Sequence, residues 1–415
     1  MARGSPLVRR GLLAAVLAGA ALIPSHALGL PSSRCSGHCG FAGTIRWTRL
    51  LPGTWVARDG IGGAVPSQGE AYAAAGSDVA AVGFGMTVAA FQAQTGDPLW
   101  TTALAGFPAA SSIVSVRAWS GTVTVGVTVP AANAGDPARA EVVLGNRTGR
   151  QLGRYPAAAY GGAVAAGETS TVVVGRASVT SYDTATGKAA WDRPTGAVPQ
   201  AWRVDRGELY VTVAKDGYLG AAPVTALRRI DLATGTERVI RPAGGSFAGT
   251  LSGAFDGVVL FSGSGALTAY SGQTGHLLWQ QQSTLPGSVD DESGTLYVAK
   301  RNELVGIDPQ TGARIGRSSA PDSAGLYGIR GGVALGLDLG ALGDAWGYDI
   351  EDRRVIWTTQ ALPWPHYFVD LSGIGGSADP ASSTVLLTKC AEAGAAPPGG
   401  KGQACLRAEL VAVSR

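Results

Sequence analysis

The stretch "SYDTATGKAAW" (residues 181–191) places an aromatic residue on each side of a short polar segment. Asp183 can hydrogen-bond the backbone of the residues that follow it, and Gly187 can adopt the positive φ that a tight turn needs. Tyr182 precedes this segment and Trp191 follows it. The pattern therefore predicts two antiparallel strands joined by a turn.

The same pattern recurs along the chain. The segments "AFQAQTGDPLW" (90–100) and "AYSGQTGHLLW" (269–279) keep the two aromatic positions, and six copies in all keep a Thr-Gly pair. The glycines of these pairs are Gly96, Gly149, Gly187, Gly235, Gly275 and Gly312. A seventh copy, "GYDIEDRRVIW" (347–357), has Asp352 and Arg353 in place of the pair. Successive copies are 37 to 53 residues apart, which is the size of a propeller blade.

A tryptophan accompanies several copies of the repeat. Where it is present after the turn, it stands four residues beyond the glycine or its equivalent. We expect it to begin the next antiparallel strand and to cover the seam to the neighbouring blade. These structural tryptophans are Trp47, Trp100, Trp191, Trp279 and Trp357.

Each end of the repeat region carries half of a copy. Residues 44–50 ("TIRWTRL") resemble a tryptophan strand without the preceding half, and residues 408–415 ("AELVAVSR") resemble the preceding half without a turn after it. If the two halves pair, they complete an eighth blade and leave no free sheet edge. We therefore predict an all-β fold: an eight-bladed β-propeller over residues 43–415, closed by its N- and C-terminal strands in one blade.

Residues 1–27 are predicted to form a secretory signal peptide. The basic segment "MARGSPLVRR" precedes an apolar run at 11–23, and Ser25 and Ala27 fit a cleavage site after Ala27. The alternative is an uncleaved membrane anchor, since the run extended to Leu30 approaches the ~20 residues that span a bilayer. We expect the rest of the chain, beginning with a short segment at 28–42, to lie outside the cytoplasm with no further membrane span.

Composition narrows the partners and the chemistry. The 415 residues include 62 glycines and 22 prolines, and only 15% are charged, which favours short strands and turns over surface helices. The net charge of +3 is too small to indicate nucleic-acid binding. Four histidines and four cysteines leave a small stock for a zinc site or a histidine-based triad. We expect a monomer that binds no nucleic acid.

The four cysteines are expected to form two disulfides, because exported chains usually hold their cysteines oxidised. Cys390 and Cys405 stand at the two feet of an insertion between strands expected at 384–389 and 406–413, which favours a Cys390–Cys405 bridge.

The other two cysteines precede the first strand of the propeller. Cys35 and Cys39 would then lie at the opposite end of the closing strand pair, roughly 25 Å from Cys405 at ~3.3 Å per residue, which is beyond disulfide reach. We therefore predict a Cys35–Cys39 bridge. The alternative is a metal or redox site built from Cys35, Cys39 and His38.

The repeat resembles the tryptophan-docking motif of the quinoprotein propellers. That motif consists of a small residue, an aromatic residue or leucine, aspartate, two variable residues, Thr-Gly and a tryptophan, and residues 181–191 contain all of it. Within that superfamily the chain looks like the PQQ-like repeat proteins without enzyme activity, a group that includes the BamB-type lipoproteins. The resemblance covers nearly all of residues 43–415 and implies the propeller fold.

The same superfamily contains PQQ-dependent alcohol and glucose dehydrogenases. Those enzymes use a calcium ion, an aspartate base and, in the alcohol enzymes, a disulfide between adjacent cysteines. This sequence has no adjacent cysteines and no recognisable calcium set. We therefore assign no catalytic residue and no metal site and expect no cofactor, with PQQ and calcium as the alternative.

Aromatic residues outside the repeat indicate a binding face. Trp55, Trp202 and Trp364 fall between a motif strand and the first strand of the next blade, and such connections share the propeller face around the central channel. The candidate face comprises Trp55, Arg58, Trp202, Arg203, Tyr218, Trp364, His366 and Tyr367. Exposed aromatic residues beside arginines are typical binding contacts. The alternative is that these side chains pack between blades.

An acidic cluster at 289–294 ("VDDESG") is the other candidate feature. A calcium loop needs ligands at alternating positions with a turn glycine, and Asp290, Asp291 and Glu292 lack that spacing. We predict a solvated hairpin here.

These observations favour an exported, non-catalytic propeller that binds a protein or cell-envelope ligand. The alternative is a PQQ- and calcium-dependent quinoprotein oxidoreductase.

Overall fold

The computed structural model places part of the chain well enough to describe. The described residues are 45–51, 55–57, 64–66, 72–76, 78–119, 121–130, 138–157, 162–165, 169–213, 223–263, 265–282, 288–290, 293–300, 303–319, 326–330, 332–338, 344–358, 367–368, 384–394 and 403–414. Within strands, the description of some residues, including Trp55, Trp357, Tyr367, Cys390 and Cys405, is limited to the backbone. The predicted signal peptide and the segment at 28–42 lie outside the described residues.

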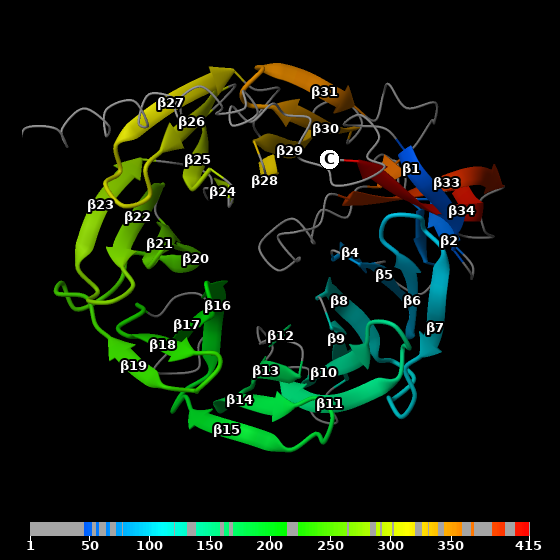
Figure 1. Cartoon of the computed structure of the whole chain (residues 1–415), viewed down its shortest axis with the longest axis horizontal. Coiled ribbons are helices and arrows are strands. Elements are labelled where there is room, and N and C mark those ends of the chain that lie inside the picture. The colour runs from blue at the N-terminus through cyan, green and yellow to red at the C-terminus, as the bar shows by residue number, and fades with distance from the viewer. Residues whose placement is uncertain are drawn as a thin grey trace, which may run out of the picture. The chain divides into compact units, whose positions relative to one another are not determined.

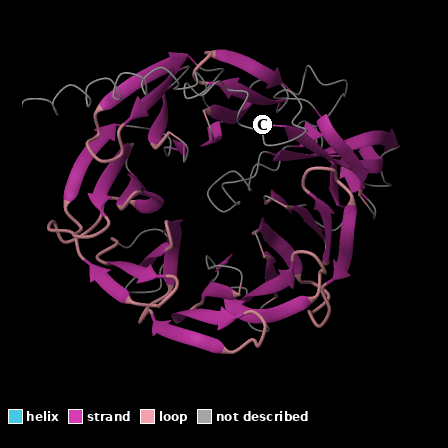
Figure 2. Ribbon diagram, in the orientation of Figure 1, coloured by secondary structure: helices cyan, strands magenta, loops and turns pink. Residues whose placement is uncertain are grey.

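The described residues are all-β, with strands joined by turns and none in a helix (Figure 2). They belong to the unit Gly40–Arg415, which is separate from the unit Met1–Cys39. Within the larger unit the strands form eight antiparallel sheets arranged as the blades of a propeller (Figure 1). The predicted fold class is confirmed.

Seven blades contain four strands each, which follow one another in chain order from the inner to the outer edge (Figure 1). Blade 1 comprises β4 (Tyr72–Ala75), β5 (Val79–Phe84), β6 (Thr87–Gln92) and β7 (Pro98–Ala103). Blade 2 comprises β8 (Ser112–Ala118), β9 (Thr122–Val129), β10 (Ala138–Gly145) and β11 (Gln151–Ala157). Blade 3 comprises β12 (Gly162–Ala165), β13 (Ser170–Val174), β14 (Ser178–Asp183) and β15 (Ala189–Pro194).

The other four-stranded blades have the same order. Blade 4 comprises β16 (Pro199–Asp205), β17 (Glu208–Val213), β18 (Leu227–Asp231) and β19 (Glu237–Ile240). Blade 5 comprises β20 (Thr250–Phe255), β21 (Val258–Gly263), β22 (Ala266–Ser271) and β23 (Leu277–Gln282). Blade 6 comprises β24 (Ser288–Asp290), β25 (Thr295–Lys300), β26 (Glu303–Ile307) and β27 (Arg314–Ser319). Blade 7 comprises β28 (Leu326–Arg330), β29 (Val333–Asp338), β30 (Asp344–Asp349) and β31 (Arg354–Thr358).

The eighth sheet, the shared blade, is built from both ends of the propeller. It contains β1 (Ile45–Leu50), β2 (Trp55–Ala57), β3 (Ala64–Pro66), β32 (Tyr367–Phe368), β33 (Thr384–Gly394) and β34 (Gln403–Ser414). β34 pairs with β33 on one side and with β1 and then β2 on the other. In this register Thr48 lies opposite Val411, so the predicted pairing of the end strands is present.

Burial follows the position of each strand in its blade. The second strands are buried on both faces, as in β5 and β21, whose sequences are "VAAVGF" and "VVLFSG". The outer strands β7 and β15 are mostly exposed, and only the third and fifth residues of each are half-buried. An apolar run buried on both faces is typical of a strand between two packed layers, so the core consists of layers between adjacent blades.

A β-bulge recurs between the third and the outer strand of every four-stranded blade except blade 4. In blade 3, Tyr182 pairs with Ala189 but Ser181 pairs with Trp191, so one residue is skipped. The same skip precedes Trp100 in blade 1 and Trp279 in blade 5. A bulge of this kind bends the strand locally. The outer strand therefore begins two residues before the tryptophan, earlier than we predicted from the sequence.

Candidate functional site

The turn of the opening stretch is held together by its own polar residues. Asp183 Oδ1 accepts hydrogen bonds from the backbone nitrogen and the hydroxyl of Thr186, at 2.7 and 2.8 Å. These bonds, the hydroxyl bond first, lower the pKa of Asp183. Asp231 and Thr234 repeat the arrangement in blade 4. The Asp and Thr of the motif are therefore accounted for by turn geometry.

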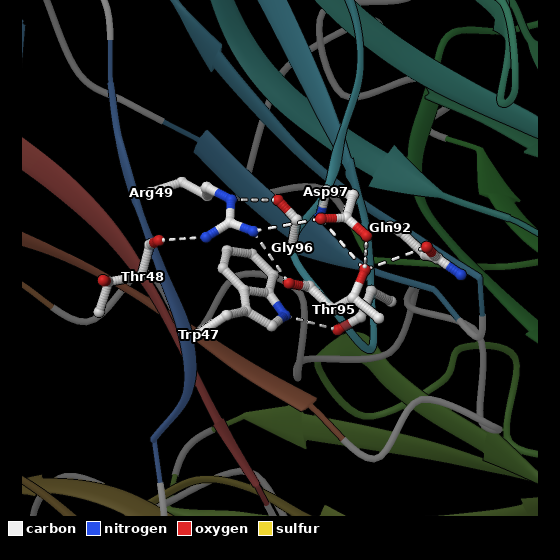
Figure 3. Close-up of polar contacts among 8 residues, drawn as sticks. Trp47, Thr48, Arg49, Gln92, Thr95, Gly96 and Asp97 are labelled. Atoms are coloured by element: carbon white, nitrogen blue, oxygen red, sulfur yellow. Dashed lines mark hydrogen bonds and ion pairs between the residues drawn. The ribbon is translucent and has the colours of Figure 1, made fainter. Parts of the chain in front are cut away.

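Each docked tryptophan lies over the turn of the following blade. Figure 3 shows Trp47 of β1 against the turn of blade 1, with its Nε1 donating to Ala93 O at 2.9 Å and Gly96 close to its ring. Trp100, Trp191 and Trp279 lie in the same way on Gly149, Gly235 and Gly312, where an added Cβ would come within 2.5 Å of the indole. A side chain at these glycines would collide with the ring.

A second contact of the repeat was not predicted. The residue two positions after the tryptophan donates a side-chain hydrogen bond to the carbonyl oxygen of the glycine under the indole. Arg49 Nε donates to Gly96 O at 2.5 Å (Figure 3), and Gln281 Nε2 donates to Gly312 O at 2.7 Å. Thr102 and Arg193 make the equivalent bonds to Gly149 and Gly235. These polar side chains of the outer strands therefore join each blade to the next.

Two turns differ because the preceding blade has a glycine in place of the tryptophan. Gly153 replaces it in blade 2, and the space beside Gly187 contains no other atom within 4 Å of an added Cβ. Gly316 replaces it in blade 6, and the next turn carries Arg353 with φ of 54°. The seventh copy can hold an arginine because no indole covers that position.

Aspartates at the inner hairpins also join blades. Asp205 Oδ2 accepts a hydrogen bond from Gly257 N of blade 5 at 2.9 Å. Asp290 Oδ2 accepts one from Gly332 N of blade 7 at 3.1 Å and another from Ser293 Oγ at 2.7 Å. Asp290 is 1% exposed. The prediction of a solvated hairpin is wrong for Asp290, because its carboxylate links blades 6 and 7. Asp291 and Glu292 lie outside the described residues.

Trp202 and Arg203 are residues of the predicted binding face that do not belong to the repeat. Both lie in β16, the innermost strand of blade 4, and not in the connection before it, where we had placed Trp202. Arg203 Nε donates to Ser252 O of β20 at 2.8 Å, and its Nη1 donates to Trp202 O at 2.7 Å. Both side chains are partly exposed.

Arg117 joins this pair from two blades away. Its guanidinium carbon lies 5.3 Å from the centre of the Trp202 ring. Gly162 of β12 lies between them, since a Cβ there would be 2.6 Å from Trp202 Cζ2 and 3.0 Å from Arg117 Nη1. The missing side chain of Gly162 therefore allows an arginine of blade 2 to meet a tryptophan of blade 4 across the inner strand of blade 3. We call Arg117, Trp202 and Arg203 the arginine–tryptophan cluster.

A buried ion pair lies beside Arg117 in blade 2. Arg139 Nε donates to Glu141 Oε1 at 3.0 Å, and Arg139 Nη2 donates to Ser115 Oγ at 2.8 Å. Glu141 is fully buried. Burial raises its pKa, while the charges of Arg139 and then Arg117 oppose that rise. Burial also lowers the pKa of Arg117.

The rest of the predicted face divides into two groups. The backbones of Trp55 and Tyr367 lie in the shared blade, where they pair with Cys405 and Lys389. That blade is on the opposite side of the ring from β16 (Figure 1), so these two residues are not part of the arginine–tryptophan cluster. The others lie outside the described residues: Arg58, Tyr218, Trp364 and His366.

The strands of the shared blade extend past both described cysteines. Cys390 lies opposite Ala408, and Cys405 lies opposite Ala393, so the two cysteines are not direct cross-strand partners. β33 continues to Gly394 and β34 begins at Gln403, so Cys390 and Cys405 are within the strands and not at the feet of the loop. The Cys390–Cys405 bridge stays a prediction. Cys35, Cys39 and His38 lie outside the described residues.

The sequence contains a signal for Arg117 that we missed. Arg117 stands four residues before Gly121, and Arg203 stands four residues before Gly207. Both glycines belong to the hairpin turns between the first two strands of their blades. Aligning the inner strands, instead of only the Thr-Gly turns, would have brought the two arginines to the same position.

The described residues contain neither a metal-ligating group nor a membrane-spanning helix. No group of three His, Cys, Asp or Glu residues there is arranged to hold a metal ion. No helix in the described part of the chain is long and apolar enough to cross a membrane.

Comparison with solved structures supports the fold. The dihydro-heme d1 dehydrogenase NirN is 15% identical with a TM-score of 0.51, over 76% of this chain and 78% of that one. The computationally designed Ika8 protein is 13% identical with a TM-score of 0.50, over 77% and 90%. BamB from Moraxella catarrhalis is 16% identical over 74% and 97%, but its TM-score of 0.40 is too low to support an argument. These identities indicate shared architecture alone.

Comparison of the sequence with family models is more specific. A model described as outer membrane protein assembly factor BamB matches residues 138–284 and 201–326. Comparison with curated proteins gave no match. The family-model matches extend from the third strand of blade 2 to the start of blade 7, and blade 1, outside them, docks its tryptophan on the next turn in the same manner. Over residues 138–326 the chain is therefore similar to the family that this model describes, and its eight sheets have the arrangement of a β-propeller.

Proposed function

We propose that the chain is an exported, non-catalytic β-propeller that binds a protein or cell-envelope ligand through the face that carries its non-repeating aromatic residues. The observation that supports this proposal is a division of labour among polar side chains. Those of the repeat, such as Asp183 and Arg193, hold turns and seams. Trp202 and Arg203 belong to no copy of the repeat; they also contact neighbouring blades, but both side chains stay partly exposed on an inner strand.

The proposed face follows from the antiparallel order of the blades. The first and third connections within a blade lie at one end of its strands, and the second connection and the link to the next blade lie at the other end. The Thr-Gly turns are third connections. The proposed ligand face is the one opposite the Thr-Gly turns, which carries the second connections and the links between blades. Trp202 and Arg203 lie on β16 below this face, nearer the first connection of blade 4 and so nearer the end that carries the Thr-Gly turns.

Two further considerations support the assignment. The matching family model is described as an assembly factor, and assembly factors act by binding other proteins. The predicted signal peptide at 1–27 supports a place of action outside the cytoplasm.

Site-specific photo-crosslinking in the natural host tests the ligand face. Four exposed alanines form a matched set: Ala110 and Ala243 in links between blades, and Ala185 and Ala233 in Thr-Gly turns. We expect a photoreactive residue at Ala110 or Ala243 to capture a ligand, identified by mass spectrometry, and one at Ala185 or Ala233 to capture none.

Two results would count against this function. Equal capture from both faces would show that ligand binding is not confined to the proposed face. PQQ- and calcium-dependent dye reduction by the purified chain, with PQQ binding at micromolar levels, would identify an oxidoreductase instead.

A further inference from the structure

The two arginines of the arginine–tryptophan cluster occupy the same position in their blades. Arg117 pairs with Thr124 and Arg203 pairs with Tyr210, and each partner is the third residue of the second strand. The equivalent residues of the other four-stranded blades are small or apolar: Ala74, Val164, Gly253, Ser288 and Gly328. At this level of the ring, positive charge is concentrated in blades 2 and 4.

Arg117 has a hydrogen-bond donor that no described residue uses. Its Nη1 atom is out of contact with solvent and has no hydrogen-bond partner there. Burying an N–H group of a charged guanidinium is unfavourable unless an acceptor forms a hydrogen bond with it. The Trp202 ring lies beside the guanidinium, and such a contact stabilises the cation without accepting its in-plane hydrogen bonds.

The local charge is unbalanced among the described residues. Two arginines, Arg139 and Arg117, act on one buried carboxylate, Glu141, whose Oε1 is bonded to Arg139 and whose Oε2 has no hydrogen-bond partner in the described part of the chain. Arg203 is close to Arg117 and adds a third positive charge. Arg203 and Arg117 are close enough that the charge of Arg117 contributes to lowering the pKa of Arg203, after burial as the main cause. An added anion would relieve that repulsion.

We propose that the arginine–tryptophan cluster binds an oxyanion, a carboxylate or phosphate group of the ligand. Guanidinium groups bind both groups through paired, charge-assisted hydrogen bonds. Arg117 Nη1 supplies the main donor, Trp202 holds the Arg117 guanidinium in place, and Arg203 adds a second positive charge. Gly162 leaves room for this arrangement at the inner edge of blade 3. The inference deepens the proposed binding function and rests on it for its biological meaning.

Titration calorimetry with the purified chain tests the site directly. The probes are sodium citrate and sodium phosphate, with sodium chloride at matched ionic strength as the reference. We expect at least one oxyanion to bind with a Kd below about 1 mM, and the better probe distinguishes a carboxylate from a phosphate source. Arg117→Gln should weaken binding at least about tenfold, because hydrogen bonds to charged groups are among the strongest in proteins.

The matched control is Arg238→Gln, which removes an exposed arginine from β19 and should leave the Kd unchanged. Arg203→Gln should weaken binding several-fold. Circular dichroism and thermal melting establish that each variant is folded. If Arg117→Gln does not fold, Arg117→Lys, which keeps the charge but loses the planar fork, and Arg203→Gln decide the question.

The proposal is overturned if neither oxyanion binds with a Kd below about 1 mM, or if folded Arg117→Gln or Arg203→Gln binds as tightly as Arg238→Gln. Its failure is separate from failure of the proposed function. If crosslinking is specific to one face but no oxyanion binds, the oxyanion site is wrong and the proposed function stands. If an oxyanion binds but no ligand is crosslinked, the proposed protein or cell-envelope ligand is wrong and the oxyanion site stands.

Discussion

Gly235 lies directly beneath the indole of Trp191, so that an added Cβ would be 2.5 Å from Trp191 Cδ2, whereas Gly187, at the same position of the neighbouring turn, has no other atom within 4 Å. The two glycines have nearly the same φ, 68° and 69°. They therefore separate two reasons for a glycine in this repeat: the left-handed backbone, which both require, and the close approach of an indole, which only Gly235 experiences.

Substituting alanine at each position measures the value of the docking contact. Both Gly187→Ala and Gly235→Ala should lose about 1–2 kcal/mol of unfolding free energy, because an L-residue is unfavourable at positive φ. Gly235→Ala should lose a further ~1–3 kcal/mol through collision with the ring. Chemical unfolding measures both values, and equal losses would show that the indole tolerates the methyl group.

The seventh turn offers the reverse experiment. Arg353 has a left-handed backbone and an exposed side chain. Arg353→Gly should raise the unfolding free energy by about 1 kcal/mol, because the left-handed conformation is strained for any L-residue with a Cβ. Arg353→Ala keeps the strain and should give no such gain in the same assay.

The buried ion pair of blade 2 should be sensitive to the loss of one partner. Glu141→Ala is expected to lower the unfolding free energy by about 3–5 kcal/mol, because it leaves Arg139 without its buried counter-charge. The double variant Arg139→Met/Glu141→Met should lose less, since Arg139 is then removed together with its counter-charge.

The comparison for this prediction is the exposed pair between Arg206 and Asp256. Arg206→Ala should cost no more than about 1 kcal/mol, because solvent screens that pair. A loss at Glu141→Ala as small as at Arg206→Ala would contradict the assigned importance of burial.

The aspartates of the turns should make the protein sensitive to acid. Hydrogen bonds from neighbouring hydroxyl and amide groups hold the pKa values of Asp183, Asp231 and Asp308 below the ordinary value. A carboxylate with a depressed folded pKa stabilises the fold above the unfolded pKa, about 4, and this stabilisation is lost as pH falls through the folded pKa.

Unfolding measurements between about pH 5 and pH 2 should therefore show decreasing stability. Asp183→Asn should reduce the slope of this dependence. A carboxyl titration by NMR that placed the pKa of Asp183 at or above its ordinary value would contradict the assignment.

The pairing of the two ends should be essential for cooperative unfolding. Val411 is buried in β34 and lies opposite both Thr48 and Leu387. Val411→Pro removes a backbone donor in the middle of this sheet and should abolish a single transition in thermal melting. Leu99→Pro, at the bulge of the outer strand β7, should be far milder.

The repeat made most of the fold predictable. The Thr-Gly turns are local features, and Asp183 and Gly187 reveal them through turn chemistry. Closure was predictable as well, because Trp47 and Val413 belong to incomplete halves of the same repeat, and they lie in strands that pair.

Contacts between blades could not be read from single turns. Asp290 looked solvated because its acceptor role depends on Gly332 of another blade. Arg117 was missed because its neighbours, Gly162 and Trp202, lie in two different blades. Trp202 was placed in a connection because the start of a short inner strand has no turn signal of its own.

The position of β1 beside β34 has a consequence for biosynthesis. The first strand of the propeller leaves the ribosome before any other, yet its only partner strand in the described structure is the last to be made. Contacts so distant along the chain form slowly. A nascent chain can assemble its middle blades early, but β1 has no partner until translation is nearly complete. Such a chain remains unclosed until its last strand is made.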